Sequence, residues 1–263
     1  MTELRPFFVA GKRVFGSERF AVTHPVDGSL VAEVSVPDAA HIEEAVAAAA
    51  AVQHDLEDAP AVLRARALDH ISAQLARRRQ EVAELITAEN GKPIRWAVAE
   101  VERAVTTFRV AAEEARRFSG DLMRLDTEDG SEGRLALVRR FSRGPVLAIA
   151  PFNFPLNLVA HKVAPAIAVG APVIIKPAPA TPLSALLLGE ILAETELPPG
   201  SWSVLTATND QMPTLVQDPR LPVVSFTGSA EIGWRIRDSI PRKHVTLELG
   251  GNAAAIVCAV YSS

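Results

Sequence analysis

From residue 145 onward, short apolar runs alternate with stretches of helical character, and this alternation constrains the fold more than any other feature. The apolar runs lie at 146–150, 173–175, 203–205, 223–226, 244–247 and 255–257. The helical stretches between them lie at about 157–169, 182–195, 209–217 and 230–239. Strands that are apolar throughout and separated by helices predict an α/β fold, in which a parallel sheet is covered by helices on both faces.

The chain before residue 145 has a different character. Short strands are predicted at 7–12, 19–22 and 30–34, and 38–118 is helical. We expect Asp38 to cap the first helix and Pro60 to lie in the first turn of a second. A third helix should run from 79 to about 89 and end at Asn90-Gly91, and a fourth from about 93 to 118.

Residues 119–143 interrupt the helical region with a predicted β-hairpin. Apolar segments at 122–125 and 134–139 flank the turn residues 129–133. A protruding hairpin has free edges, and these are often covered by another subunit. We therefore divide the chain into an N-terminal part (1–118), the hairpin (119–143) and an α/β core (144–263).

Composition excludes several classes of function. Hydrophobic residues make up 48% of the chain and the net charge is −4, which excludes a disordered chain and gives no bulk-charge argument for nucleic acid or an anionic membrane. Prolines and Lys162 break the uncharged runs, so no membrane-spanning helix is expected. The single cysteine and six scattered histidines predict no disulfide and no metal site. The first residues lack the apolar segment of a secretory signal, and we expect a cytoplasmic protein.

Ligands of parallel sheets bind beyond the carboxyl ends of the strands. Four segments in such positions carry chemically useful residues: 151–155, 176–182, 226–233 and 248–251.

Each of these segments has both a functional and a structural interpretation. The Asn153 amide could donate to a developing oxyanion or satisfy its own loop. Lys176 could bind a phosphate or ribose, or be a solvated lysine. The turn from Gly228 to Gly233, which contains Ser229, could present backbone amides to a phosphate, although its spacing is a weak motif. Glu248 could act as a general base, or it could be a helix N-cap or a solvated carboxylate.

Taken together, the four segments resemble the aldehyde dehydrogenase superfamily in order and spacing. The matching motifs are Pro-Phe-Asn-Phe-Pro at 151–155, Lys-Pro-x-x-x-Thr-Pro at 176–182, Phe-Thr-Gly-Ser-x-x-x-Gly at 226–233 and Glu-Leu-Gly-Gly-Asn at 248–252. The segments at 24–28 and 89–93 are also similar to that family, and the hairpin stands where the family has its oligomerisation arm. The resemblance covers nearly the whole chain.

The resemblance implies a Rossmann-like domain that binds NAD or NADP, in an enzyme that oxidises a small aldehyde to an acid and forms a homo-oligomer. It implies that Asn153 belongs to the oxyanion hole and that Glu248 activates the hydrolytic water, which favours hydrolysis over transfer to coenzyme A. The implied cofactor-binding residues are Pro151, Phe152, Lys176, Pro177, Ala178, Pro179, Phe226, Thr227, Gly228, Ser229, Gly233, Leu249 and Gly250.

The sequence departs from the family pattern at two points. Many NAD-preferring members have a glutamate where this chain has Pro179. Without that carboxylate there is no repulsion against the 2′-phosphate of NADP, so the sequence does not decide between NAD and NADP. Family members are nearly twice as long, and their nucleophilic cysteine should lie about 35 residues beyond Glu248. Cys258 lies too early, and we expect it to be a small buried hydrophobe on a strand. We therefore expect this chain to be the cofactor-binding half, without the catalytic domain and without turnover of its own.

Another class of function stays open, namely a non-catalytic nucleotide-binding or interaction module. Two other enzyme classes are excluded by their motifs. A short-chain dehydrogenase needs Tyr-x-x-x-Lys, and the only tyrosine is Tyr261. The Gly-Lys pairs at 11–12 and 91–92 lack the earlier glycine of a P-loop.

Overall fold

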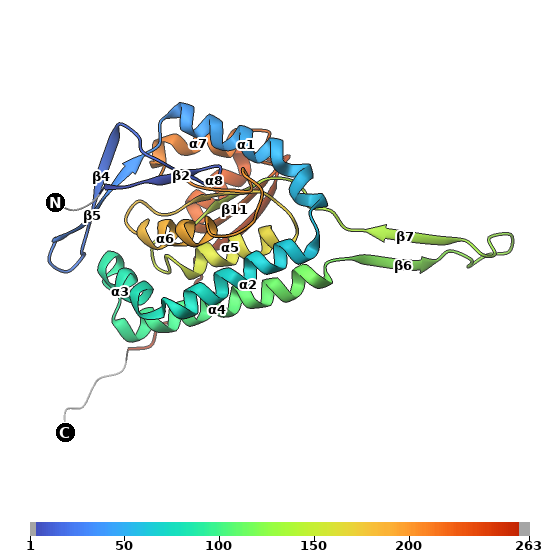
Figure 1. Cartoon of the computed structure of the whole chain (residues 1–263), viewed down its shortest axis with the longest axis horizontal. Helices are drawn as coiled ribbons and strands as arrows, with labels where there is room; N and C mark the ends of the chain where they lie inside the picture. The colour runs from blue at the N-terminus through green and yellow to red at the C-terminus, as the bar shows by residue number, and fades with distance from the viewer. Residues whose placement is uncertain (1–3, 258–263) are drawn as a thin grey trace, which may run out of the picture.

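A seven-stranded sheet, which includes β2 and β11 of Figure 1, forms the centre of the fold. Its strand order is β12-β11-β8-β9-β10-β2-β3. The computed structural model describes residues 4–257. The strands of this sheet are β2 (Phe7–Val9), β3 (Lys12–Val14), β8 (Val146–Ile149), β9 (Val173–Lys176), β10 (Trp202–Val204), β11 (Val223–Gly228) and β12 (His244–Leu249). Strands β8 to β12 are mutually parallel, which confirms the predicted sheet.

Helices cover both faces of this sheet, as predicted. One face packs against α5 (Asn157–Ala168) and α6 (Leu183–Leu192), beyond which lie α2 (Ala61–Arg77), α3 (Arg79–Asn90) and α4 (Ile94–Arg117). The other face packs against α1 (Ala39–Asp58), the 3-10 turn η1 (Asn209–Gln211) with α7 (Met212–Gln217), and α8 (Ala230–Ser239). Alternate residues of β8 point to opposite faces, so Ala148 joins the first core and Leu147 and Ile149 the second.

A smaller sheet at the N-terminal end has the order β1-β5-β4, with β1 (Leu4–Arg5), β4 (Glu18–Thr23) and β5 (Leu30–Val36). The predicted strands at 19–22 and 30–34 are confirmed. The single strand expected at 7–12 is instead the hairpin β2–β3, because Ala10 and Gly11 both have positive φ (49° and 84°) and reverse the chain between them.

The predicted helix boundaries are largely confirmed. The Asp38 side chain accepts a hydrogen bond from the His41 amide at 3.0 Å and caps α1. Gly91 ends α3 with φ 74°, the left-handed conformation that glycine adopts without strain. Pro60 and Pro93 occupy the positions just before α2 and α4, one residue outside the helices.

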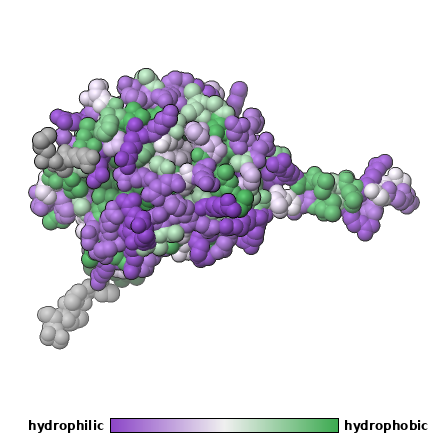
Figure 2. Space-filling view, viewed as in Figure 1, coloured by the Kyte–Doolittle hydropathy of each residue, from purple (hydrophilic) through white to green (hydrophobic). Residues whose placement is uncertain are grey.

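The predicted hairpin protrudes from the body of the molecule (Figure 1). It consists of β6 (Gly120–Arg124) and β7 (Leu135–Arg139), which pair in antiparallel fashion. Figure 2 shows a hydrophobic band over its strands and a hydrophilic tip. Leu122 and Leu137 are cross-strand partners within the hairpin, and Leu137 is 87% exposed.

The strand predicted at 255–257 is wrong. Residues 251–257 have no secondary structure, and Ile256 and Val257 are 87% and 94% exposed. The segment does not return along the free edge of β12, so its backbone finds no ladder partner among residues 4–257. Cys258 lies outside the described residues, so its predicted burial has no structural counterpart here.

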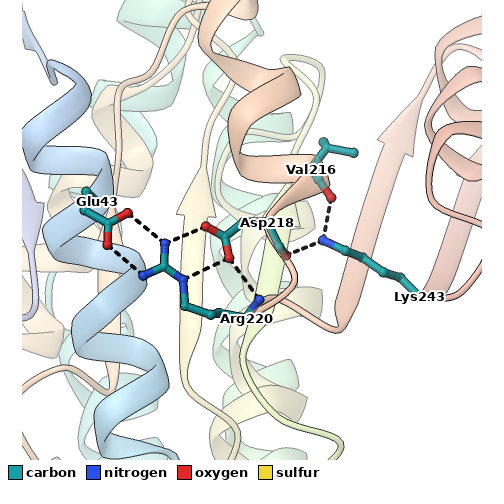
Figure 3. A network of polar contacts seen from close by, with 5 residues as sticks. All are labelled: Glu43, Val216, Asp218, Arg220 and Lys243. Atoms are coloured by element: carbon teal, nitrogen blue, oxygen red, sulfur yellow. Dashed lines mark hydrogen bonds and ion pairs between the residues drawn. The ribbon is translucent and has the colours of Figure 1, made fainter.

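A network of hydrogen bonds and ion pairs connects α1 with the segments that precede β11 and β12 (Figure 3). The Arg220 guanidinium donates to both carboxylate oxygens of Glu43 at 2.7 Å and to Asp218 Oδ2 at 2.6 Å. Lys243 Nζ donates to the carbonyl oxygens of Val216 and Asp218 at 2.5 Å. These contacts hold the end of the sheet opposite to the one where the predicted site residues gather. Among the helices described, none has the length and hydrophobicity needed to cross a membrane.

Candidate active site

The four segments singled out in the sequence meet at the carboxyl edge of the parallel strands. The ladder pairs Ile149 of β8 with Lys176 of β9 and with Phe226 of β11. It also pairs Thr227 with Glu248 of β12. Because the strands are parallel and in this register, the loops that follow them emerge side by side.

One cavity at this edge, of about 610 Å³, lies between the loops after β8, β9 and β11. The cavity contains most of the residues expected to bind the cofactor: Pro151, Phe152, Lys176, Ala178, Pro179, Phe226, Thr227, Gly228 and Ser229. Lys176 and Arg235 are the charged residues that line it, and no described carboxylate does so.

A second cavity, of about 450 Å³, adjoins the first. Asn153, Glu248, Leu249 and Gly250 line it, together with Arg103 from α4. The two cavities share five lining residues, namely Pro151, Phe152, Thr227, Gly228 and Ser229. The predicted catalytic residues and the predicted cofactor-binding residues therefore face adjoining spaces.

Two of the predicted cofactor-binding residues line neither cavity. Pro177 is buried directly after β9. Gly233 lies in α8, where a Cβ atom would come within 2.4 Å of Leu249 Cδ2. The absence of a side chain at Gly233 thus allows α8 to approach β12 closely.

Lys176 is a buried cation that has no carboxylate partner within residues 4–257. It is 4% exposed, and its ammonium donates to Asn209 Oδ1 at 3.1 Å. No described carboxylate forms an ion pair with it, and burial lowers its pKa to about 8. A buried charge is costly unless it is paired, so an anionic or hydroxyl-rich ligand in the adjoining cavity fits this position.

Three helices begin just after the site loops, and only α8 begins without a side-chain cap. The amides of Leu156 and Asn157 at the start of α5 donate to Glu100, at 3.0 and 3.1 Å. The start of α6 is capped by the Glu89 carboxylate. Ser229 precedes α8, and its side chain makes no capping hydrogen bond.

Glu89 caps α6 from the end of α3. Its carboxylate accepts hydrogen bonds from the amides of Leu183 at 2.7 Å and Ser184 at 2.9 Å, and from the Ser184 hydroxyl. Burial raises the pKa of Glu89 to about 7, against the opposing effect of these hydrogen bonds. Buried carboxylates cap α5 and α6, whereas the first turn of α8 has no side-chain cap and borders the first cavity, where its backbone amides could bind an anion.

A polar chain missed by the sequence analysis leads from Glu248 into the protein. The Thr227 hydroxyl donates to Glu248 Oε2 at 3.1 Å. Lys162 Nζ of α5 donates to the hydroxyls of Thr227 at 2.8 Å and Ser225 at 3.1 Å. Burial lowers the pKa of Lys162 to about 8, and the nearby Glu248 carboxylate opposes this shift. The one signal in the sequence was a single lysine inside a long apolar stretch.

The two asparagines of the second cavity differ in environment. Asn153 is exposed, and its side-chain amide makes no hydrogen bond with any described residue. The amide therefore does not bind the backbone of its own loop. Asn157 is 1% exposed, and both of its amide atoms lack a partner within the described part of the chain. Sequence analysis did not identify Asn157, which looks like an ordinary helix residue. Residues 4–257 contain no group of three or more His, Cys, Asp or Glu side chains able to hold a metal ion.

Comparison with known proteins identifies relatives along most of the chain. The aldehyde dehydrogenase family profile matches residues 14–261. A 3-sulfolactaldehyde dehydrogenase of Priestia aryabhattai is 36% identical over 261 residues, which cover 98% of this chain and 54% of the relative. Aspartate-semialdehyde dehydrogenase 1 of Pseudomonas canavaninivorans is 37% identical, over 90% of this chain and 50% of the relative.

Solved structures show the same fold. Aldehyde dehydrogenase 21 from Physcomitrella patens, in complex with the reaction product succinate, has a TM-score of 0.93 and 42% identity, and the match covers 96% of this chain and 53% of that one. An NADP-dependent glyceraldehyde-3-phosphate dehydrogenase from Bacillus halodurans C-125, complexed with NADP, has a TM-score of 0.90 and 32% identity, and the match covers 95% and 53%. The chain thus spans about half the length of these relatives.

Proposed function

The chain belongs to the aldehyde dehydrogenase family, and we propose that it is the cofactor-binding half of an NAD(P)-dependent enzyme that oxidises an aldehyde to a carboxylic acid. The observation that carries the proposal is the pair of adjoining cavities at the carboxyl edge of the sheet. Within the described part of the chain, the first cavity contains a buried cation without an ion-pair partner and a helix N-terminus without a side-chain cap. The second contains a side-chain amide without a hydrogen-bond partner and a carboxylate.

The first cavity has the chemistry that a dinucleotide requires. Lys176 would contact the adenosine ribose, and Ser229 with the first amides of α8 would bind the pyrophosphate. The nicotinamide, when bound, supplies the hydride acceptor. Relatives have been solved with NADP and with nicotinamide adenine dinucleotide.

The charges of this cavity favour NADP as one of its ligands. Lys176 and Arg235 line it, and Pro179 stands where a carboxylate would repel a 2′-phosphate. Arg235 also forms an exposed ion pair with Glu231 at 2.7 Å, which leaves Lys176 as the stronger attraction because it is buried and unpaired.

In the second cavity, Asn153 and Glu248 would carry out complementary tasks. The Asn153 amide would donate a hydrogen bond to the oxygen on which negative charge develops when the aldehyde carbonyl is attacked. The Glu248 carboxylate would accept a proton from the water that hydrolyses the acyl intermediate. Thr227, itself held by Lys162, would orient Glu248 through its 3.1 Å hydrogen bond. The attacking cysteine would come from the catalytic half.

The substrate class that fits best is an aldehyde with an anionic tail. Arg103 lines the second cavity and forms no ion pair with a described carboxylate, unlike Arg109 and Arg116 further along α4. Several relatives have names that specify such aldehydes, including sulfolactaldehyde and aspartate semialdehyde. We further propose that the exposed apolar strands of the β6–β7 hairpin mediate self-association of the complete enzyme.

Isothermal titration calorimetry of the folded chain with NADP and with NAD tests the proposal. We expect saturable binding of at least one dinucleotide, and at least about tenfold weaker binding after Lys176→Ala, because a hydrogen bond to a charged group contributes about 1.5–3 kcal/mol. Lys12→Ala, at an exposed lysine of β3, is the control and should bind like the parent. A folded chain that binds neither dinucleotide would contradict the proposal.

A further inference from the structure

Side chains from outside the 151–156 loop hold its backbone in place. The Asn90 side-chain amide, at the end of α3, donates to the carbonyl oxygen of Phe152 at 2.8 Å. Lys92 Nζ, in the connection between α3 and α4, donates to the carbonyl oxygen of Asn153 at 2.8 Å. Two successive carbonyl groups of the loop that carries Asn153 are therefore bound by residues about 60 positions earlier in the sequence.

Lys92 is itself held in one position. Its ammonium donates to Glu100 Oε2 at 2.5 Å and lies 3.9 Å from the centroid of the Phe154 ring. The Lys92 side chain is 12% exposed and that of Glu100 is fully buried. An ion pair shielded from water in this way has a defined geometry, unlike an exposed one.

Glu100 connects this ion pair to the far end of the loop. Its other oxygen, Oε1, accepts hydrogen bonds from the amides of Leu156 and Asn157, where α5 begins. Asn90, Lys92 and Glu100 thus bind the backbone of the loop on both sides of Asn153. We call these three residues the loop clamp.

We propose that the loop clamp is a positioning device for Asn153. This inference rests on the proposed function, in which the Asn153 amide must meet a developing oxyanion. Such a donor has to be placed within about 0.5 Å, which requires a backbone that does not move. With both flanks of the loop bound, the remaining freedom of Asn153 lies in its own side-chain torsions.

The variant Lys92→Met/Glu100→Gln separates positioning from folding. Methionine keeps an apolar stem over the Phe154 ring, and glutamine keeps an acceptor oxygen for the amides of α5. The double change removes both charges together, so no buried charge is left unpaired. The matched control is Arg79→Met/Glu102→Gln, which neutralises an exposed ion pair between α3 and α4 at 2.5 Å.

The readout is the NMR spectrum of the free chain, so it does not depend on cofactor binding. The side-chain amide resonance of Asn153, identified by its loss in Asn153→Asp, should shift in Lys92→Met/Glu100→Gln. Amide exchange at Leu156 and Asn157 should become faster, because the neutral glutamine oxygen accepts weaker hydrogen bonds from these amides than the Glu100 carboxylate does. Asn90→Ala should shift the Asn153 resonance by a smaller amount than the double variant does. The single variant Lys92→Arg, which keeps a charged donor, should have a spectrum closer to that of the parent than to that of the double variant. The control pair should leave the resonance and the exchange rates unchanged.

A folded double variant with parental Asn153 resonance and parental amide exchange would overturn the proposal. If the double variant does not fold, Asn90→Ala tests the proposal instead, because it removes a single hydrogen bond at a half-buried position. An unshifted Asn153 resonance in Asn90→Ala would also overturn the proposal. Failure of the proposed function would show itself differently, as a parental chain that binds no dinucleotide while its loop responds to the clamp variants.

Discussion

The affinity of the chain for NADP should depend on pH through the ammonium group of Lys176. Burial lowers the pKa of Lys176 to about 8, whereas an ordinary lysine titrates near 10.4. An anionic ligand beside the ammonium favours its charged form and raises its pKa in the complex. Binding above pH 8 therefore takes up a proton, and the affinity falls as the pH rises through 8 toward the pKa of the complex.

The size of this effect follows from the pKa. With a value of about 8, the protonated fraction of Lys176 falls from about 0.9 at pH 7 to about 0.1 at pH 9, so the association constant should fall about tenfold over that interval. Calorimetry at pH 7, 8 and 9, in two buffers of different ionisation enthalpy, measures both the affinity and the proton uptake. Lys176→Met should bind NADP weakly at all three values and show no such slope.

A matched control comes from Lys162, whose pKa burial also lowers to about 8 but which lines neither cavity. Lys162→Met should retain the parental pH dependence of NADP binding. The reasoning fails if the parental affinity is constant between pH 7 and 9, or if the slope survives in Lys176→Met.

Two further predictions concern stability and assembly. The pKa of Glu89 is about 7 in the folded state and near 4.5 in the unfolded chain, so between these pH values only the folded state keeps the Glu89 proton. The free energy of unfolding should therefore decline as the pH rises from about 4.5 to 7, by at most about 3 kcal/mol. Urea unfolding at about pH 5 and about pH 7.5 measures this decline, and Glu89→Gln should flatten it. A decline of equal size in the variant would show that other groups cause it. The change Leu137→Glu, at an 87% exposed position in the apolar band of the hairpin, should reduce self-association measured by sedimentation without lowering the melting temperature. The control Glu132→Gln, at the tip of the hairpin, should leave self-association unchanged. If the parent self-associates and Leu137→Glu sediments as the parent does, the hairpin does not mediate the association.

Features that depend on neighbouring residues could be predicted from the sequence by itself. Apolar runs between helical stretches predicted the parallel sheet and its two helical layers, since strand and helix periodicity is local. The caps at Asp38 and Gly91 and the hairpin at 119–143 also follow from short-range hydrogen bonding and turn preferences. The motifs identified the segments that meet at the carboxyl edge, because the ends of parallel strands emerge together. The division at residues 118 and 143 stays a prediction.

Contacts between distant segments were decided only by the tertiary structure. The pairing of Phe8 in β2 with Val204 in β10 adds two N-terminal strands to the sheet of the α/β core, and no local pattern encodes such a partner. An apolar run at 255–257 has strand composition but finds no ladder among the described residues, because pairing needs a neighbour as well as propensity. Glu89, Lys92, Glu100 and Lys162 look like ordinary charged residues in the sequence. Folding buries Glu89, Glu100 and Lys162 and leaves the Lys92 side chain 12% exposed. Each of them contacts a helix end, a loop or a strand residue tens of positions away, which local sequence patterns do not specify.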